Sequence, residues 1–213
     1  MSEGKFKGSF ILLMVVGTTA GGQGTFLYDQ QSSTNDTPFP GAGSIIQQGS
    51  PGFGQSFTPS LGSVGFIRLK VSDANPTNGL GATLYLNLRS DSIGGAILGS
   101  TEPVSLPNGF AGTPNFFFAN PVSVSPGVVY YFQPVVQTGD LWYADSYEYN
   151  YPGGIGFHQG WGFPGSDMWF REGIVVPEPS ASLLLFLGGC ALAFVRSVRA
   201  RKPVSLSREA NRT

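Results

Sequence analysis

Cysteine, histidine and charged side chains are scarce in this chain of 213 residues. It has one cysteine, Cys190, one histidine, His158, and only 12% charged residues. A single cysteine excludes an intrachain disulfide, and one histidine with one cysteine is too few for a zinc site. Cys190 lies in an apolar run near the C-terminus, which also excludes a Cys/His nucleophile pair. The sequence also lacks Gly-x-Ser-x-Gly and His-Glu-x-x-His motifs. We therefore expect a non-catalytic protein with no metal or cofactor.

Carboxylates leave two other kinds of site open. A glycosidase needs only two acids, and Glu148 with Asp145 or Asp167 would supply them. Calcium is a further alternative, because Asp140, Asp145, Glu148 and Asp167 offer hard oxygen ligands. Their spacing matches no EF-hand loop. Our first interpretation is that they are solvated acids.

Basic residues are nearly absent from the middle of the chain. The stretch from Gly21 to Pro179 holds four basic residues and eleven acidic ones, so its formal charge is 4 minus 11, or -7. An acidic body disfavours nucleic acid, whose affinity comes mostly from phosphate neutralisation by Lys and Arg. The chain also holds 31 Gly and 16 Pro, a composition that predicts many turns and an all-β body.

The N-terminus has the order of a secretory signal peptide. Lys5 and Lys7 precede an apolar run, Phe10 to Val16, and small residues follow up to Gly21. The apolar run is too short to span a bilayer, which takes about 17 to 25 residues. We predict a signal peptide over residues 1–20, exported through the Sec translocon. The alternative is a soluble N-terminal helix.

The C-terminus combines a short polar motif, an apolar run and a basic cluster. After Val176 comes the motif Pro177-Glu178-Pro179, and residues 181–195 are then apolar apart from Ser182. The basic cluster consists of Arg196, Arg199, Arg201 and Lys202. Basic residues stay on the cytoplasmic side, so this order predicts a transmembrane helix over 181–195 with Glu178 outside.

These residues resemble the PEP-CTERM sorting domain over residues 176–202. The resemblance implies that an exosortase recognises Pro177, Glu178 and Pro179 and cuts near them, after a transient stay in the inner membrane. The processed protein would then reach the cell surface or the extracellular matrix. The polar tail, 203–213, departs from the family pattern, in which the chain usually ends soon after the arginines. The alternative is an ordinary single-span anchor.

Two segments of the body alternate apolar and polar residues, as half-buried strands do. Val64 to Ser72 places Ile67, Leu69 and Val71 on one face with Phe66, Arg68 and Lys70 on the other, and Ala82 to Ser90 points three leucines inward. Further short strands are expected at 55–58, 96–98, 103–106, 115–118, 122–124, 128–136, 141–144 and 168–175. Short strands joined by Gly and Pro turns predict one β-sandwich or jelly-roll domain over 55–175. Residues 21–54 are read as irregular, with a possible edge strand at Thr25 to Tyr28. The body pattern also resembles β-sandwich ectodomains that precede such sorting tails.

All three tryptophans lie between Asp140 and Glu172, among tyrosines, amides and acids. Aromatic faces stack on the C–H side of a sugar while polar groups bind its hydroxyls. The candidate glycan-binding residues are Trp142, Tyr143, Tyr147, Tyr149, Tyr151 and Trp161. The alternative is a long loop that uses its aromatic residues as a small core of its own.

The sequence therefore supports two functions of different classes. One is an exported structural or adhesive component of the extracellular polysaccharide matrix, and the other is a glycan-binding module. A secreted hydrolase ranks third.

Overall fold

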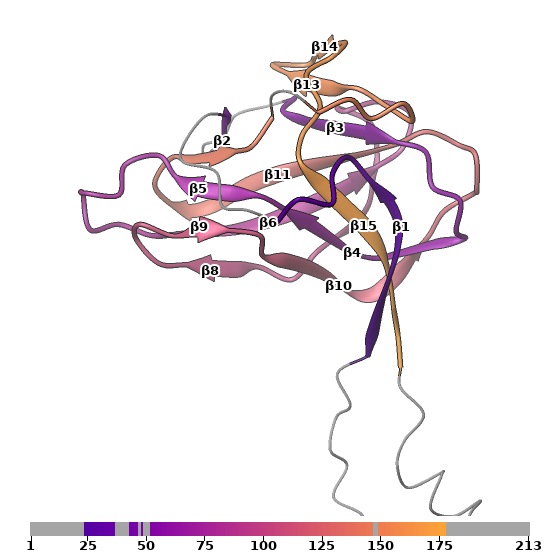
Figure 1. The fold of residues 1–213 in the computed structure, drawn as a ribbon, viewed down its shortest axis with the longest axis horizontal. Coiled ribbons are helices and arrows are strands. Elements are labelled where there is room, and N and C mark those ends of the chain that lie inside the picture. The colour runs from indigo at the N-terminus through magenta and orange to yellow at the C-terminus, as the bar shows by residue number, and fades with distance from the viewer. Residues whose placement is uncertain (1–23, 37–42, 47, 49–51, 147–148, 178–213) are drawn as a thin grey trace, which may run out of the picture. The chain divides into compact units, whose positions relative to one another are not determined.

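The body of the protein is built from β-strands. The computed structural model describes residues 24–36, 43–46, 48, 52–146 and 149–177, and these residues contain strands but no helix. Residues Thr25–Val176 form one compact unit, and their strands pair antiparallel in three sheets (Figure 1). The expectation of an all-β body is confirmed.

The three sheets take strands from distant parts of the chain. Sheet A has the order β1 (Thr25–Gln31), β15 (Phe170–Val176), β4 (Ser63–Leu69) and β10 (Asn115–Ser123). Sheet B has the order β2 (Ser44–Ile46), β12 (Trp142–Ala144), β5 (Val71–Asp73) and β9 (Ala111–Gly112). Sheet C has the order β14 (Trp161–Phe163), β13 (Gly156–His158), β3 (Gly54–Phe57), β11 (Tyr130–Gly139), β6 (Ala82–Arg89) and β7 (Ile97–Ser100), with β8 (Val104–Leu106) also on β6.

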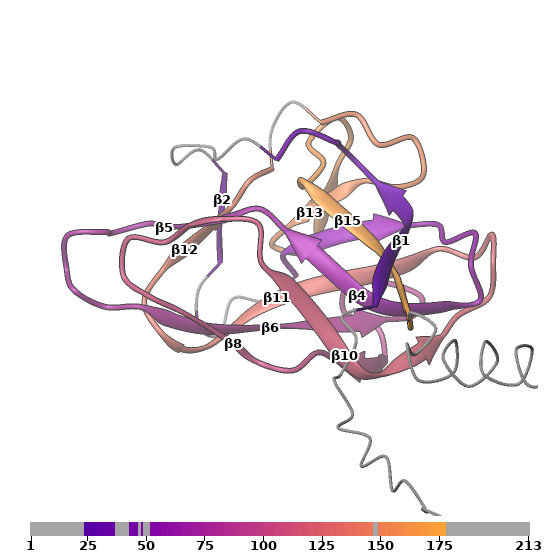
Figure 2. The same cartoon turned by 60° about the horizontal axis from the view of Figure 1, so that its bottom comes forward.

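Sheets A and B share a layer because the chain passes directly from one to the other. Only Lys70 separates β4 from β5, and only Thr113 and Pro114 separate β9 from β10. This layer faces sheet C in a sandwich-like arrangement (Figure 2). The core between them takes buried side chains from all three sheets, including Ile67, Val71 and Leu86. Alternation along the strands placed these residues correctly, because successive side chains point to opposite faces.

The predicted strand from Val64 to Ser72 is interrupted at Lys70. The Asp145 backbone N–H donates to the Lys70 carbonyl over 3.0 Å, and Lys70 Nζ lies 3.2 Å from Asp145 Oδ2. Both side chains are buried. Lys70 thus points away from the core, as the alternation predicts, but an acid from a distant segment covers it.

The body begins at Thr25 rather than at Gln55. β1 pairs with β15, with Thr25 opposite Val176 at one end and Gln31 opposite Arg171 at the other, and it forms an edge of sheet A. Residues 21–54, which the sequence places outside the sandwich, therefore contribute β1 and also β2. Their partners follow more than 90 residues later in the chain, so no local pattern could reveal the pairing.

Aromatic rings cover the outer face of sheet A. Phe66 has no exposed surface, and the ring centroids of Phe26, Tyr28 and Phe117 lie 4.9, 5.6 and 6.3 Å from its own. The Arg68 guanidinium lies 5.5 Å from the Phe26 ring and 5.7 Å from the Tyr28 ring, a favourable cation–π geometry. Phe66 is therefore buried although it faces away from the core.

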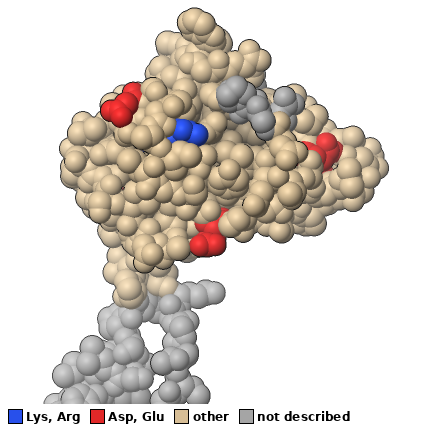
Figure 3. Space-filling model, turned by 180° about the vertical axis from the view of Figure 1, so that it is seen from behind, with Lys and Arg blue, Asp and Glu red and all other residues tan. Residues whose placement is uncertain are grey.

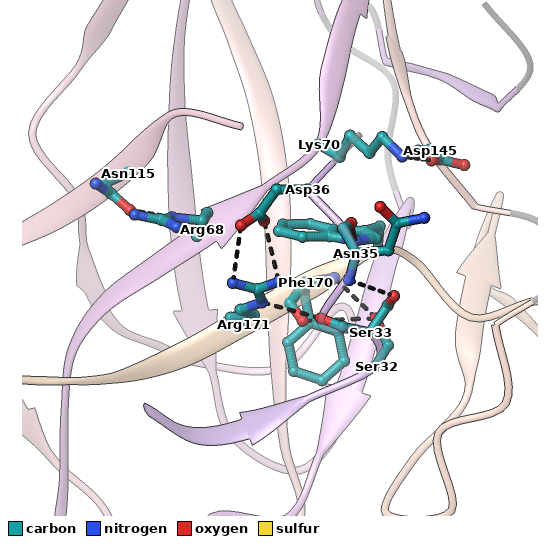
Figure 4. A network of polar contacts seen from close by, with 11 residues as sticks. Ser32, Ser33, Asn35, Asp36, Arg68, Lys70, Asn115, Asp145, Phe170 and Arg171 are labelled. Carbon is teal, nitrogen blue, oxygen red and sulfur yellow. Dashed lines mark hydrogen bonds and ion pairs between the residues drawn. The ribbon is translucent and has the colours of Figure 1, made fainter. Parts of the chain in front are cut away.

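Residues 32–36 cover the beginning of β15 (Figure 4). The Trp169 indole N–H donates to the Asn35 carbonyl over 2.8 Å. Arg171 donates to the Ser33 carbonyl over 2.9 Å and forms an ion pair with Asp36 at 3.0 Å. Its guanidinium also lies 4.9 Å from the Trp169 ring centroid. These contacts hold the segment after β1 against sheet A.

Candidate functional site

The predicted aromatic cluster is divided between the core and the surface. Trp142 is 0% exposed and packs 6.2 Å from the Phe110 ring. Tyr151 is also buried, and its hydroxyl donates to Gln30 Oε1 over 2.9 Å. Neither ring presents a free face to a ligand, which corrects their assignment as stacking residues. Trp161, in contrast, is 75% exposed.

The remaining tyrosines do not join Trp161. Tyr143 lies in β12 between Ile45 and Ser72. The Tyr149 hydroxyl donates to Asp145 Oδ2 over 2.7 Å. Both are partly exposed, and Tyr147 lies outside the described residues. The six predicted residues therefore do not form one surface in the described structure.

Trp161 belongs to a hairpin that the sequence analysis did not predict. β13 pairs with β14, and β13 also pairs with β3, which attaches the hairpin to sheet C. The turn residues Gln159 and Gly160 have φ values of 50° and 85°, as in the two-residue turns that favour hairpins. The Gly160 N–H donates to the Gly52 carbonyl over 2.8 Å, so the turn is held against the body. In the sequence, this hairpin corresponds to ring and small residues on both sides of Gln159-Gly160.

One face of the hairpin carries three ring side chains. His158 and Trp161 are directly paired, and Phe163 lies two residues beyond Trp161, so all three side chains point to the same face. The His158 ring centroid lies 6.3 Å from that of Phe163 and 6.1 Å from that of Phe53. Phe163 is 48% exposed. We call this set, His158, Trp161 and Phe163, the hairpin aromatic face.

A cavity of about 220 Å³ lies beside this face. It is lined by rings, hydroxyls, glycines and one methionine, and by no Asp, Glu, Lys or Arg. The lining residues are Ser44, Phe53, Gly54, Ser146, Gly156, Phe157, His158, Phe163, Ser166 and Met168. The hairpin strands and their turn, residues 156–163, also contain no charged residue. Across the face of the body shown in Figure 3, the charged groups are few and scattered. This chemistry suits an uncharged ligand.

Three of the four candidate acids lie among the described residues, and each contacts another side chain. Asp145 pairs with Lys70, and Asp140 accepts a hydrogen bond from Asn78. Asp167 accepts from the Gln55 amide over 2.7 Å and from the Tyr151 N–H over 2.8 Å. Glu148 lies outside the described residues. Within the part of the chain that the structure describes, no three His, Cys, Asp or Glu residues are grouped to hold a metal ion.

The carboxyl group of Glu172 is buried beside the partly exposed carboxyl group of Asp29, and the two have opposite pKa shifts. Burial, followed by the charge of Asp29, raises the pKa of Glu172 to about 9. Burial also acts to raise the pKa of Asp29, but hydrogen bonds from Ser60 and Leu61 outweigh it and hold that pKa below its usual value. Glu172 is 0% exposed and cannot touch a ligand. Glu172 is therefore a structural residue of sheet A.

The sorting residues are mostly outside the described structure. Pro177 is exposed and follows β15 directly. Glu178, Pro179 and the basic cluster at Arg196, Arg199, Arg201 and Lys202 lie outside the described residues, as do the predicted signal peptide and transmembrane helix. No helix among the described residues is long and apolar enough to cross a membrane.

No protein-family model matches the chain, and no curated protein or solved structure matches it.

Proposed function

We propose that this chain is an exported, surface-sorted protein with a non-catalytic β-sandwich body, which serves as a structural or adhesive component of an extracellular polysaccharide matrix. The observation that carries the proposal is the order of segments in the sequence. An N-terminal signal pattern is followed by an acidic body, Pro177-Glu178-Pro179, an apolar run and the basic cluster. The Sec translocon would export the chain, the helix at 181–195 would hold it in the membrane, and an exosortase would process it.

The geometry of the body is compatible with display on a surface. Thr25 and Val176 are paired, so the two ends of the body lie side by side. The β13–β14 hairpin projects from the other end of the body (Figure 1). A body held through the segment that follows Val176 would present the hairpin, with Trp161, outward.

A glycan-binding module is the second candidate. The supporting observation is the hairpin aromatic face, where Trp161 is 75% exposed beside a cavity without charged residues. The secreted hydrolase has less support, because Asp145 and Asp167 are both committed to internal partners.

The processing step can be tested by replacing Glu178. We expect Glu178→Ala to remain membrane-bound at full length, while the wild-type protein is shortened and released. Glu102→Ala is the matched control, because Glu102 is an exposed acid in the body and its replacement should leave processing unchanged. Immunoblotting of the membrane and released fractions measures the processing. Equal release of the Glu178→Ala and wild-type proteins would contradict exosortase recognition.

A further inference from the structure

Two buried hydroxyl groups, those of Ser44 and Ser146, line the cavity beside the hairpin. Ser44 Oγ and Ser146 Oγ lie 2.8 Å apart, and the Ser44 backbone N–H donates to Ser146 Oγ over 2.9 Å. Each hydroxyl has one hydrogen, and only one of the two hydrogens is used in the bond between them. Among the described residues, the other has no protein acceptor. Both side chains are more than nine-tenths buried and line the cavity, so an acceptor on a ligand would satisfy this donor.

The lining also determines the charge that a ligand can carry. No Lys or Arg lines the cavity, so an acidic sugar would lose hydration there without gaining a lysine or arginine partner. The rings of Phe53, Phe157 and Phe163 offer apolar surface of the kind that meets the C–H groups of a sugar. Rings and hydroxyls together fit a neutral polyol.

The size of the cavity limits what can enter. Its volume of about 220 Å³ is below the roughly 300–1,000 Å³ of pockets for drug-sized ligands. It therefore suits one sugar ring rather than several. Trp161 lies on the same hairpin face and is 75% exposed, so its ring is available to stack against the next sugar of the chain.

We infer that the cavity between the hairpin aromatic face and the Ser44–Ser146 hydroxyl pair binds one unit of a neutral glycan, with Trp161 stacking on the adjoining unit. This inference rests on the proposed role in a polysaccharide matrix and specifies the sugar class that the body would recognise. It excludes uronate-rich polysaccharides as the ligand of this cavity.

The test uses the full-length protein in a detergent without a sugar headgroup. Trp142 and Trp169 are 0% exposed, so acrylamide quenching of fluorescence reports mainly on Trp161. The probes are neutral dextran, mannan and galactan, with polygalacturonate and alginate as acidic counterparts. We expect at least one neutral glycan to protect Trp161 from quenching and the two acidic glycans to leave the quenching unchanged.

The variant Phe163→Ala removes one ring from the cavity wall. We expect about tenfold weaker binding, the change that the loss of one stacked ring brings. Phe117→Ala is the matched control, because Phe117 is 40% exposed on β10 in another sheet, and it should bind as the wild type does. Circular dichroism of both variants verifies folding.

Three results would overturn the inference: no protection by any neutral glycan, stronger binding of the acidic glycans, or equal loss in Phe163→Ala and Phe117→Ala. None of them bears on processing, which the Glu178→Ala experiment measures separately. Normal processing without neutral-glycan binding would refute the cavity assignment and leave surface sorting intact. Binding without processing would refute surface sorting and leave the cavity assignment intact.

Discussion

Glu172 should make the stability of the body fall as the pH rises through the neutral range. Its side chain has no exposed surface, and Oε1 accepts the Gln30 backbone N–H over 3.1 Å. Oε2 has no hydrogen-bond partner among the described residues, so no donor stabilises a negative charge on it, and the charge of Asp29 opposes one. At neutral pH Glu172 is therefore an uncharged acid, and Glu172→Gln keeps an uncharged group of similar shape.

The magnitude follows from the pKa difference. Folding raises the pKa of Glu172 from 4.5 to about 9, so the folded state holds the proton more tightly. The stabilisation is fully present below pH 4.5 and is lost as the pH rises through about 9. At about 1.36 kcal/mol per pKa unit, the loss between pH 5.5 and pH 8.5 is at most about 4 kcal/mol. Local relaxation or water entry would reduce it.

Other shifted groups act outside this window. Asp29 has a lowered pKa, so its stabilisation is lost only as the pH falls below about 4. Burial raises the pKa of Tyr151 from 10.0 to about 12, so its contribution is lost only in strongly alkaline solution. The slope between pH 5.5 and pH 8.5 therefore reports on Glu172.

Urea denaturation of residues 25–176 at several pH values measures this slope. We expect wild type to lose stability from pH 5.5 to pH 8.5, and Glu172→Gln to show a much flatter profile and higher stability than wild type at pH 8.5. Glu102→Gln changes an exposed acid and should keep the wild-type slope. A Glu172→Gln profile that is as steep as the wild-type profile would refute the reasoning.

Two further changes test the packing of the body, each by urea denaturation. Lys70→Met leaves Asp145 as a buried charge without its ion-pair partner and should lower the free energy of unfolding by about 3–5 kcal/mol. The double variant Lys70→Met/Asp145→Leu should recover much of this stability. A double variant no more stable than Lys70→Met would contradict the expectation. Trp142→Ala leaves a cavity in the core and should lower the free energy of unfolding by about 3–5 kcal/mol. Trp161→Ala, at the exposed hairpin, should stay within about 0.5 kcal/mol of wild type. Similar losses of stability in both variants would show that the assignment of core and surface is wrong.

The aromatic side chains on the outer face of sheet A also help to hold its edge strand, β1, in place. β1 is an edge strand, and an edge with free backbone groups is open to pairing with other chains. Phe26 and Tyr28 extend from β1 over Phe66, and residues 33–36 fasten the following segment to Arg171 and Trp169. These contacts hold the edge strand in place beside the segment that leads to Pro177.

The sequence by itself determined the class of the fold and the strands with clear alternation. Ile67, Leu69, Leu84 and Leu86 are buried as predicted, because the period of two along a strand is a local property of the backbone. The expected edge strand at Thr25 to Tyr28 is also present, within the longer β1.

The tertiary structure decided which residues of similar type are buried and which remain exposed. Trp142 and Trp161 lie in equally aromatic surroundings in the sequence, yet one is 0% and the other 75% exposed. Lys70 is buried because Asp145, 75 residues later, covers it. The cavity likewise joins Ser44 to Ser146 and both to the hairpin. Such contacts depend on the pairing of distant strands, which the local alternation of apolar and polar residues does not encode.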